Sequence, residues 1–208
     1  MDTRILVFSV FFFAVFTQSA AGFGVALVTM AFLPALVGIQ IATPLVALVA
    51  VVLEFFLLLR YRSAFNFSAL WRVVLASLVG IPLGIWVFGR VSEAIVLRVL
   101  GVVLAGYALY GLLDLRLPEL AHQGWAYATG LVSGMLGGAY NVAGPPVILY
   151  GNCRRWEPAE FKSNLQGFFF INSVFVVIGH ALSRNLTTTV WEAFVYVLPA
   201  VALSLIHI

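Results

Sequence analysis

Long apolar runs, two of them broken in the middle, constrain the fold of this chain more than any other feature. Short charged or turn-rich segments separate the runs, which lie at 5–37, 44–59, 69–89, 94–113, 124–151, 163–182 and 189–208. An apolar run of about 20 residues spans a bilayer as a helix, and only helices or closed barrels satisfy the backbone in lipid. The sequence therefore predicts an all-α polytopic membrane protein, in contact with a lipid bilayer.

The composition excludes the water-soluble classes of protein. Apolar residues make up 63% of the chain and charged residues 9%, whereas a soluble domain has about 25% charged residues. The net charge of +3 is therefore no footprint of nucleic-acid binding, and we expect no nucleic-acid partner. Cys153 is the single cysteine, and the three histidines lie far apart in the sequence. We therefore expect no metal site and no cofactor.

An offset of 120 residues aligns several landmarks of the sequence. Gly24 falls on Gly144, Trp71 falls on Trp191, and the broken run 5–37 falls on the broken run 124–151. Transporters are often built from such duplications. We expect a first transmembrane repeat at 1–123 and a second at 124–208, which together form one membrane domain. The second copy has no counterpart of the run 94–113, so we expect a C-terminal truncation of about one helix, with 204–208 as a candidate non-native tail.

The basic residues favour one topology. If each broken run is a hairpin that returns to the side from which it enters, most of the basic residues lie on one side of the membrane. These are Arg60, Arg62, Arg72, Arg116, Arg154, Arg155 and Lys162. The positive-inside rule places this side in the cytoplasm, and the two copies then form an inverted repeat. If the broken runs cross fully instead, the bias nearly disappears. A signal peptide cleaved after 19–21 is a further alternative, but it would remove a segment that the repeat requires.

The two breaks are the candidate ligand site. We expect the first run to break at Gly22-Phe23-Gly24. We expect the second run to break at Gly137-Gly138 and again at Gly144-Pro145-Pro146, where Pro145 suits the first position of a new helix. Glycine lets backbone approach a ligand, and a helix N-terminus favours an anion. The alternative is helix packing, for which Gly130-x-x-x-Gly134 is a common pattern. The predicted substrate-binding residues are Gln18, Gly22, Gly24, Asn141, Gly144, Pro145 and Pro146.

Four further polar residues lie inside the apolar runs. An intramembrane carboxylate is a candidate for proton coupling, so Glu54 is the predicted coupling residue; the alternative is that it reaches the membrane interface. Asn172 and Ser173 are expected to make interhelical hydrogen bonds, with a lining role as the alternative. We expect His180, near the end of its run, to lie at the interface.

Three segments resemble the sulfite exporter TauE/SafE family of anion permeases. The residues at 18–27 resemble its N-terminal signature, and those at 130–138 and 142–147 resemble its second signature. The segment 161–165 resembles the part that follows, with Lys162 where Arg is more usual. The resemblance extends from about residue 10 to residue 200. It implies a multi-pass transporter of a bacterial inner membrane that moves sulfite, sulfoacetate or related organosulfur or organic anions.

Three other functions remain as alternatives to a permease with alternating access. An anion channel is the alternative within transport. A membrane-embedded hydrolase would need a paired Asp, a Ser with a His, or a His-Glu cluster; the runs hold Glu54 and Glu192, neither of them beside His or Asp, so we expect no enzyme. A non-transporting membrane scaffold would not require two breaks. The sequence does not specify the oligomeric state.

Overall fold

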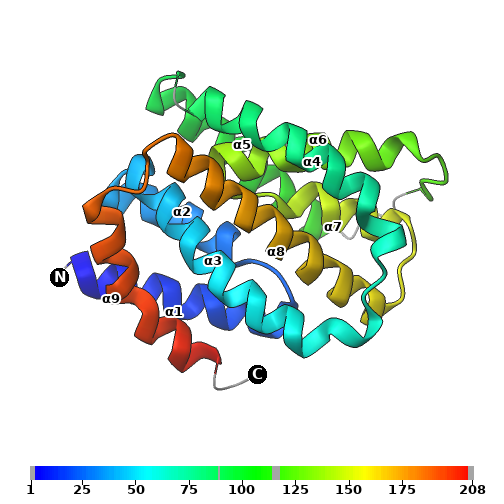
Figure 1. Ribbon diagram of the computed structural model, residues 1–208, viewed down its shortest axis with the longest axis horizontal. Helices are drawn as coiled ribbons and strands as arrows, with labels where there is room; N and C mark the ends of the chain where they lie inside the picture. The colour runs from blue at the N-terminus through cyan, green and yellow to red at the C-terminus, as the bar shows by residue number, and fades with distance from the viewer. Residues whose placement is uncertain (1–2, 89, 114–117, 206–208) are drawn as a thin grey trace.

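The fold is a bundle of helices (Figure 1), in a computed structural model that describes residues 3–88, 90–113 and 118–205. Arg116 of the predicted basic side and residues 206–208 of the predicted tail lie outside the described residues. Within the described part the secondary structure is helical, and no strand occurs there. The helices are α1 (Thr3–Ala21), α2 (Val25–Val37), α3 (Ile39–Tyr61), the 3-10 turn η1 (Arg62–Ala64), α4 (Phe67–Phe88), α5 (Glu93–Leu113), α6 (Gly124–Tyr140), α7 (Gly144–Cys153), α8 (Pro158–Leu182) and α9 (Thr188–Leu205).

Several of these helices are long and apolar enough to cross a membrane. They are α1, α4, α8 and the segment 39–64, and the shorter apolar helices include α2, most of α5 and most of α9. The central helix α3 is buried along most of its length, as expected of a helix that is apolar on all sides. The predicted class, an all-α polytopic membrane protein, is confirmed.

Both broken runs are interrupted as predicted, although one detail of the prediction is wrong. The first run breaks at 22–24 between α1 and α2, and the second at 141–143 between α6 and α7. Gly137 and Gly138 do not interrupt the second run, because α6 continues to Tyr140. A Cβ at Gly138 would overlap the carbonyl oxygen of Ile81 on α4, so this glycine serves close helix packing.

The two broken runs fold as hairpins. Val37, at the end of α2, lines the same groove as Thr3 and Arg4 at the start of α1. Just before α6 begins, the carbonyl oxygen of Leu120 accepts a hydrogen bond of 2.8 Å from Arg154, which follows α7. Figure 1 shows that the α1–α2 hairpin starts at the left end of the bundle and the α6–α7 hairpin at the right end. The hairpin interpretation is confirmed, and the hairpins enter from opposite ends.

The described basic residues divide between the two ends of the bundle. Asn66 donates its backbone N–H to Asn164 at 2.9 Å, which joins the turn after α3 to the start of α8 at one end. At the opposite end, Arg90 and Asn185 line one groove between α4 and α8. The first end carries Arg60, Arg62, Arg72, Arg154, Arg155 and Lys162, and the second carries Arg4, Arg90, Arg98 and Arg184.

Helices recur along the chain at an almost constant interval. The starts of α2 and α3 recur 119 residues later as the starts of α7 and α8, and the start of α4 recurs 121 residues later as that of α9. The packing shows the same correspondence between the two halves. Helix α1 packs on α9 and its counterpart α6 packs on α4, while α3 packs on its own counterpart α8 between the hairpins. The predicted offset of 120 lies between these intervals.

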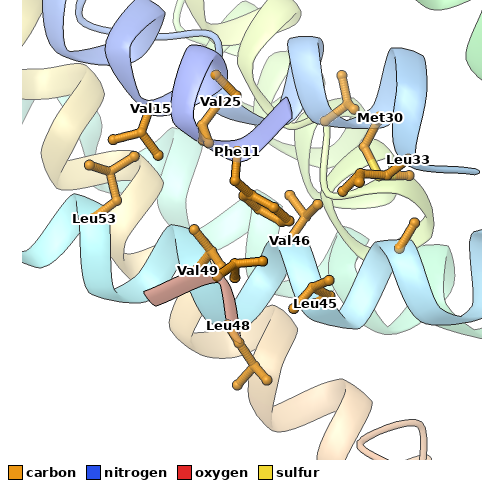
Figure 2. Close-up of a cluster of buried hydrophobic side chains, with 14 of the residues drawn as sticks. Phe11, Val15, Val25, Met30, Leu33, Leu45, Val46, Leu48, Val49 and Leu53 are labelled. Atoms are coloured by element: carbon orange, nitrogen blue, oxygen red, sulfur yellow. The ribbon is translucent and has the colours of Figure 1, made fainter. Parts of the chain in front are cut away.

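The apolar core holds the first hairpin against α3. Figure 2 shows Phe11 of α1 pointing toward Val46 of α3, with residues of α2 beside them. Phe11, Val46 and Val49 are fully buried. Within a bilayer, such side chains hold helices together by van der Waals packing, and this packing fixes the position of the first break over the middle of α3.

Candidate functional site

At both breaks, the first helix ends at a residue with a left-handed backbone conformation. Gly22 ends α1 with a φ of 84°, and Asn141 ends α6 with a φ of 57°. The N–H of each donates a hydrogen bond of 2.7 Å to the carbonyl oxygen four residues earlier, on Gln18 and Gly137 respectively. A left-handed residue commonly ends a helix in this way, and glycine and asparagine are the residues that adopt this conformation most readily. Asn141 therefore has a backbone role that the sequence analysis did not assign.

A cavity of about 30 Å³ lies where the two breaks meet α3 and α8. This volume accommodates about two water molecules. Of the predicted site residues, Gln18, Gly24, Asn141, Gly144 and Glu54 line the cavity, whereas Gly22, Pro145 and Pro146 do not. The other lining residues are Phe23, Val25, Ala26, Leu27, Ala50, Val142, Ala143, Ile148, Phe169, Asn172 and Ser173.

The three predicted residues outside the cavity wall shape its surroundings. The carbonyl oxygen of Gly22 accepts a hydrogen bond of 2.5 Å from Nε2 of Gln166 on α8, which fastens the end of α1. Pro145 and Pro146 lie in the first turn of α7, where prolines are tolerated because the N–H groups would lack helical partners. They also remove two donors, so Gly144 provides the free backbone N–H at this end of α7.

The N-terminus of α2 faces the cavity with more donors than that of α7. Oε1 of Gln18 accepts a hydrogen bond of 2.8 Å from the N–H of Val25, the first residue of α2. The next two residues, Ala26 and Leu27, line the cavity, and N–H groups at these positions have no acceptor within their helix. The positive end of the α2 dipole therefore points to the cavity.

Three amide groups converge on the cavity, and two of them lack a hydrogen-bond partner. The Gln18 amide interacts with the carboxyl group of Glu54, whereas Nδ2 of Asn141 and Nδ2 of Asn172 are buried and no described residue accepts a hydrogen bond from them. The side chains of Gln18, Asn141 and Asn172 are 1%, 7% and 3% exposed. A buried donor left unpaired costs about 1–3 kcal/mol, so each such group requires an explanation. Together with the Gln18 amide, these two unpaired groups form a donor-rich site for a ligand that accepts hydrogen bonds.

Glu54 lies in the wall of the same cavity. Its side chain is 4% exposed, and Oγ of Ser173 donates a hydrogen bond of 2.7 Å to its Oε2. The alternative that Glu54 reaches the membrane interface is therefore wrong, because the bundle encloses it on α3. Among the described residues that line the cavity, none is basic. The described residues also contain no cluster of three or more His, Cys, Asp or Glu side chains that suits a metal ion.

The polar residues of α8 were only partly predicted. Ser173 makes the expected interhelical hydrogen bond, and Asn172 and Ser173 both line the cavity. His180 lies near the end of α8. Its side chain is fully buried between helices, and its Nδ1 lies 3.0 Å from Nδ2 of Asn185. Packing of its ring edge-on against Phe88 of α4 explains the burial.

The comparison with known families agrees with this architecture. The family model described as "Sulfite exporter TauE/SafE" matches residues 7–206, nearly the whole chain. No curated protein and no solved structure matches the chain. The family consists of membrane sulfite exporters and permeases, which are transporters rather than enzymes. With its broken helices and its apolar bundle, this multi-pass membrane protein belongs to the sulfite exporter TauE/SafE family.

Proposed function

We propose that the protein is a permease that binds a small anion in the cavity between its two hairpins. The substrates would be sulfite, sulfoacetate or related organosulfur or organic anions, as the family membership favours. The observation that carries this proposal is the convergence of three buried amides, on Gln18, Asn141 and Asn172, at one cavity, where the two asparagine amides have no partner among the described residues. Hydrogen bonds to a charged acceptor are strong in such an environment of low dielectric constant.

The proposed site combines side-chain and backbone donors. Gln18 and Asn141 donate from the two hairpins, and the N-terminus of α2 adds backbone N–H groups. Gly24 and Gly144 present backbone without a side chain at the cavity wall. The remaining predicted residues, Gly22, Pro145 and Pro146, shape the turns around the site.

Alternating access explains this arrangement better than an open channel does. A channel requires a continuous water path, whereas this cavity measures about 30 Å³. Two hairpins that enter from opposite ends provide one moving element for each side of the membrane. The recurring helix starts support the assignment of 1–123 and 124–208 as inverted copies. A scaffold without transport activity would gain nothing from the unpaired donors.

The proposed orientation places the more basic end in the cytoplasm. Arg60, Arg62, Arg154, Arg155 and Lys162 lie at this end, and the positive-inside rule assigns such an end to the cytoplasmic side. Combined with the family, this supports a location in a bacterial inner membrane, with the anion and the lipid bilayer as the partners of the chain.

Ligand-induced stabilisation tests the proposal. The melting temperature of the purified protein is measured with sulfite, sulfate, thiosulfate, sulfoacetate, taurine and acetate, since a bound ligand stabilises the native state with rising concentration. The variant Asn141→Gly removes one donor and keeps the left-handed backbone. We expect a selective rise for at least one anion, and its loss in Asn141→Gly.

The control is Asn152→Ala, which removes an exposed amide at the end of α7. This variant should keep the full anion response. An equal anion response in Asn141→Gly and the unmodified protein would contradict the proposed site. Uptake of the same anion into proteoliposomes distinguishes a permease from a scaffold, for which no uptake is expected.

A further inference from the structure

The proposed anion site contains an acid and no base. Glu54 is the one ionisable side chain among the described residues that line the cavity. Two negative charges in contact repel strongly where the dielectric constant is low. An ionised carboxylate also accepts hydrogen bonds but donates none, whereas a protonated carboxyl group donates one. A bound anion and an ionised Glu54 are therefore poorly compatible.

We propose that each anion binds together with one proton carried by Glu54, so that transport is coupled to protons. This inference rests on the proposed function, because it concerns the same cavity. The protonated carboxyl group adds an O–H donor to the amides of Gln18, Asn141 and Asn172. It also cancels one negative charge in the cavity. The loaded site then changes the side of the membrane to which it opens, with the charge of the anion reduced by one.

The geometry around Glu54 supports this role. Oγ of Ser173 donates to Oε2 of Glu54, and the Gln18 amide interacts with the same carboxyl group, so the acid is held among the polar groups of the cavity. Glu54 on α3 and Ser173 on α8 lie 119 residues apart, the interval that also separates the two breaks. The acid therefore lies where the helices of the two halves meet, between the hairpins. A proton there is positioned to respond to the movement of either hairpin. Ser173 is a positioning residue, since it acts through Glu54.

No second titratable group competes at this position among the described residues. The helix α2, which packs on α3, carries none. The other titratable or charged residues on the neighbouring elements stay outside the cavity wall, namely Arg4, Arg60, Tyr61, Arg62, Tyr127, Tyr140, Tyr150, Cys153, Glu160, Lys162, His180, Glu192 and Tyr196. The pH dependence of anion binding should therefore follow a single proton.

The pH profile of binding for a permanently ionised anion tests the proposal. Methanesulfonate and sulfate serve as ligands, because neither takes up a proton in the working pH range. Any pH dependence then comes from the protein. We expect the affinity of the unmodified protein to fall by about tenfold per pH unit on the alkaline side, as linkage to one proton requires. The isosteric variant Glu54→Gln should bind with an affinity independent of pH.

Transport provides a second readout. In proteoliposomes, an inward proton gradient should drive methanesulfonate accumulation by the unmodified protein. Glu54→Gln should lose this accumulation, whereas Asn152→Ala, which lies outside the cavity wall, should keep it. In Ser173→Ala, which keeps the acid, the pH dependence should persist with a displaced midpoint. A merely structural role of Ser173 would change stability without moving this midpoint.

The outcomes separate this inference from the function on which it rests. Binding by the unmodified protein that does not change with pH would overturn the proton proposal and leave the anion site in place. Absence of binding by every anion, together with no effect of Asn141→Gly, would overturn the proposed function itself. If Glu54→Gln fails to fold, the pH profile of the unmodified protein and of Ser173→Ala still decides.

Discussion

The two hairpins share a backbone plan but are attached to the bundle in different ways. The α6–α7 hairpin packs on α4 through glycines, and a Cβ at Gly80, Gly84, Gly130 or Gly134 would overlap backbone carbonyl oxygens of the opposite helix. In the other half, α1 packs on α9 through side chains. Phe8 and Tyr196 meet edge to face, with ring centroids 6.3 Å apart.

Because of this difference, we expect the two hairpins to differ in how readily they move relative to the rest of the bundle. Direct backbone contact between α4 and α6 at four glycines leaves little room for side chains to adjust there, so these helices should move as one body. The α1–α2 hairpin rests on adjustable side chains, and its tip is fastened to α8 by the hydrogen bond from Gln166 to the carbonyl oxygen of Gly22. We therefore expect the first hairpin to move more readily during transport.

The largest expected effect concerns the glycine contact of the second hairpin. In Gly134→Leu, the new side chain would meet the backbone of Ser77. Overpacking costs about 1–3 kcal/mol where side chains can adjust, and here the obstacle is backbone. We expect loss of monodisperse folded protein, measured by size-exclusion chromatography and by the melting temperature in detergent.

Gly106→Leu is the matched control for this variant. No described atom lies within 4 Å of a Cβ built at Gly106 on α5, so the protein should fold and melt like the unmodified chain. A folded Gly134→Leu protein with an unchanged melting temperature would contradict the close contact of α4 and α6.

A smaller effect is expected at the tip of the first hairpin. Gln166→Leu leaves the buried carbonyl oxygen of Gly22 without its donor, which costs about 1–3 kcal/mol. Hydrogen exchange should become faster in α2 and at the end of α1, and should stay slow in α6, because the link to α8 is lost. Equal acceleration in both hairpins would show that they are not attached differently. Gln123→Leu, which changes an exposed residue before α6, is the control.

The two left-handed residues distinguish backbone from ligand roles. Gly22→Ala places a Cβ on a residue with a φ of 84°, and a left-handed conformation costs other residues about 1–2 kcal/mol. We expect a lower melting temperature with anion binding retained. Asn141→Gly keeps its backbone conformation, so we expect anion binding to fall at an unchanged melting temperature. The reverse pattern would contradict these assignments.

Local sequence signals predicted much of the fold. The apolar runs predicted the helices, and Pro145 correctly predicted a new helix, because proline is suited to the first turn. The same reasoning failed at Gly137 and Gly138. The sequence does not distinguish a glycine that allows a turn from a glycine that allows close packing of another helix. The packing of α4 against α6 depends on the tertiary structure.

The candidate site was predictable to a similar extent. Gln18, Asn141 and Glu54 stood out because polar groups in an apolar run are costly, and all three line the cavity. Gln166 was missed because its partner is a carbonyl oxygen 144 residues away in sequence. Asn172 was considered for lining, yet one sequence does not show whether a mid-span amide faces a neighbouring helix or a cavity.

The smallest expected effect tests the base of the second hairpin. Arg154 donates from Nη1 to the carbonyl oxygens of Leu120 and Ala121, at 2.8 and 3.3 Å, and so joins the two ends of α6–α7. These bonds are exposed to solvent, so we expect Arg154→Ala to lower the free energy of unfolding by only about 0.5–1.5 kcal/mol. Hydrogen exchange should become faster at 118–123 alone, and Arg98→Ala on exposed α5 should leave it unchanged. If the acceleration also reached α6, the base of the hairpin and not its glycine face would hold it in place, and the contrast between the two hairpins would fail.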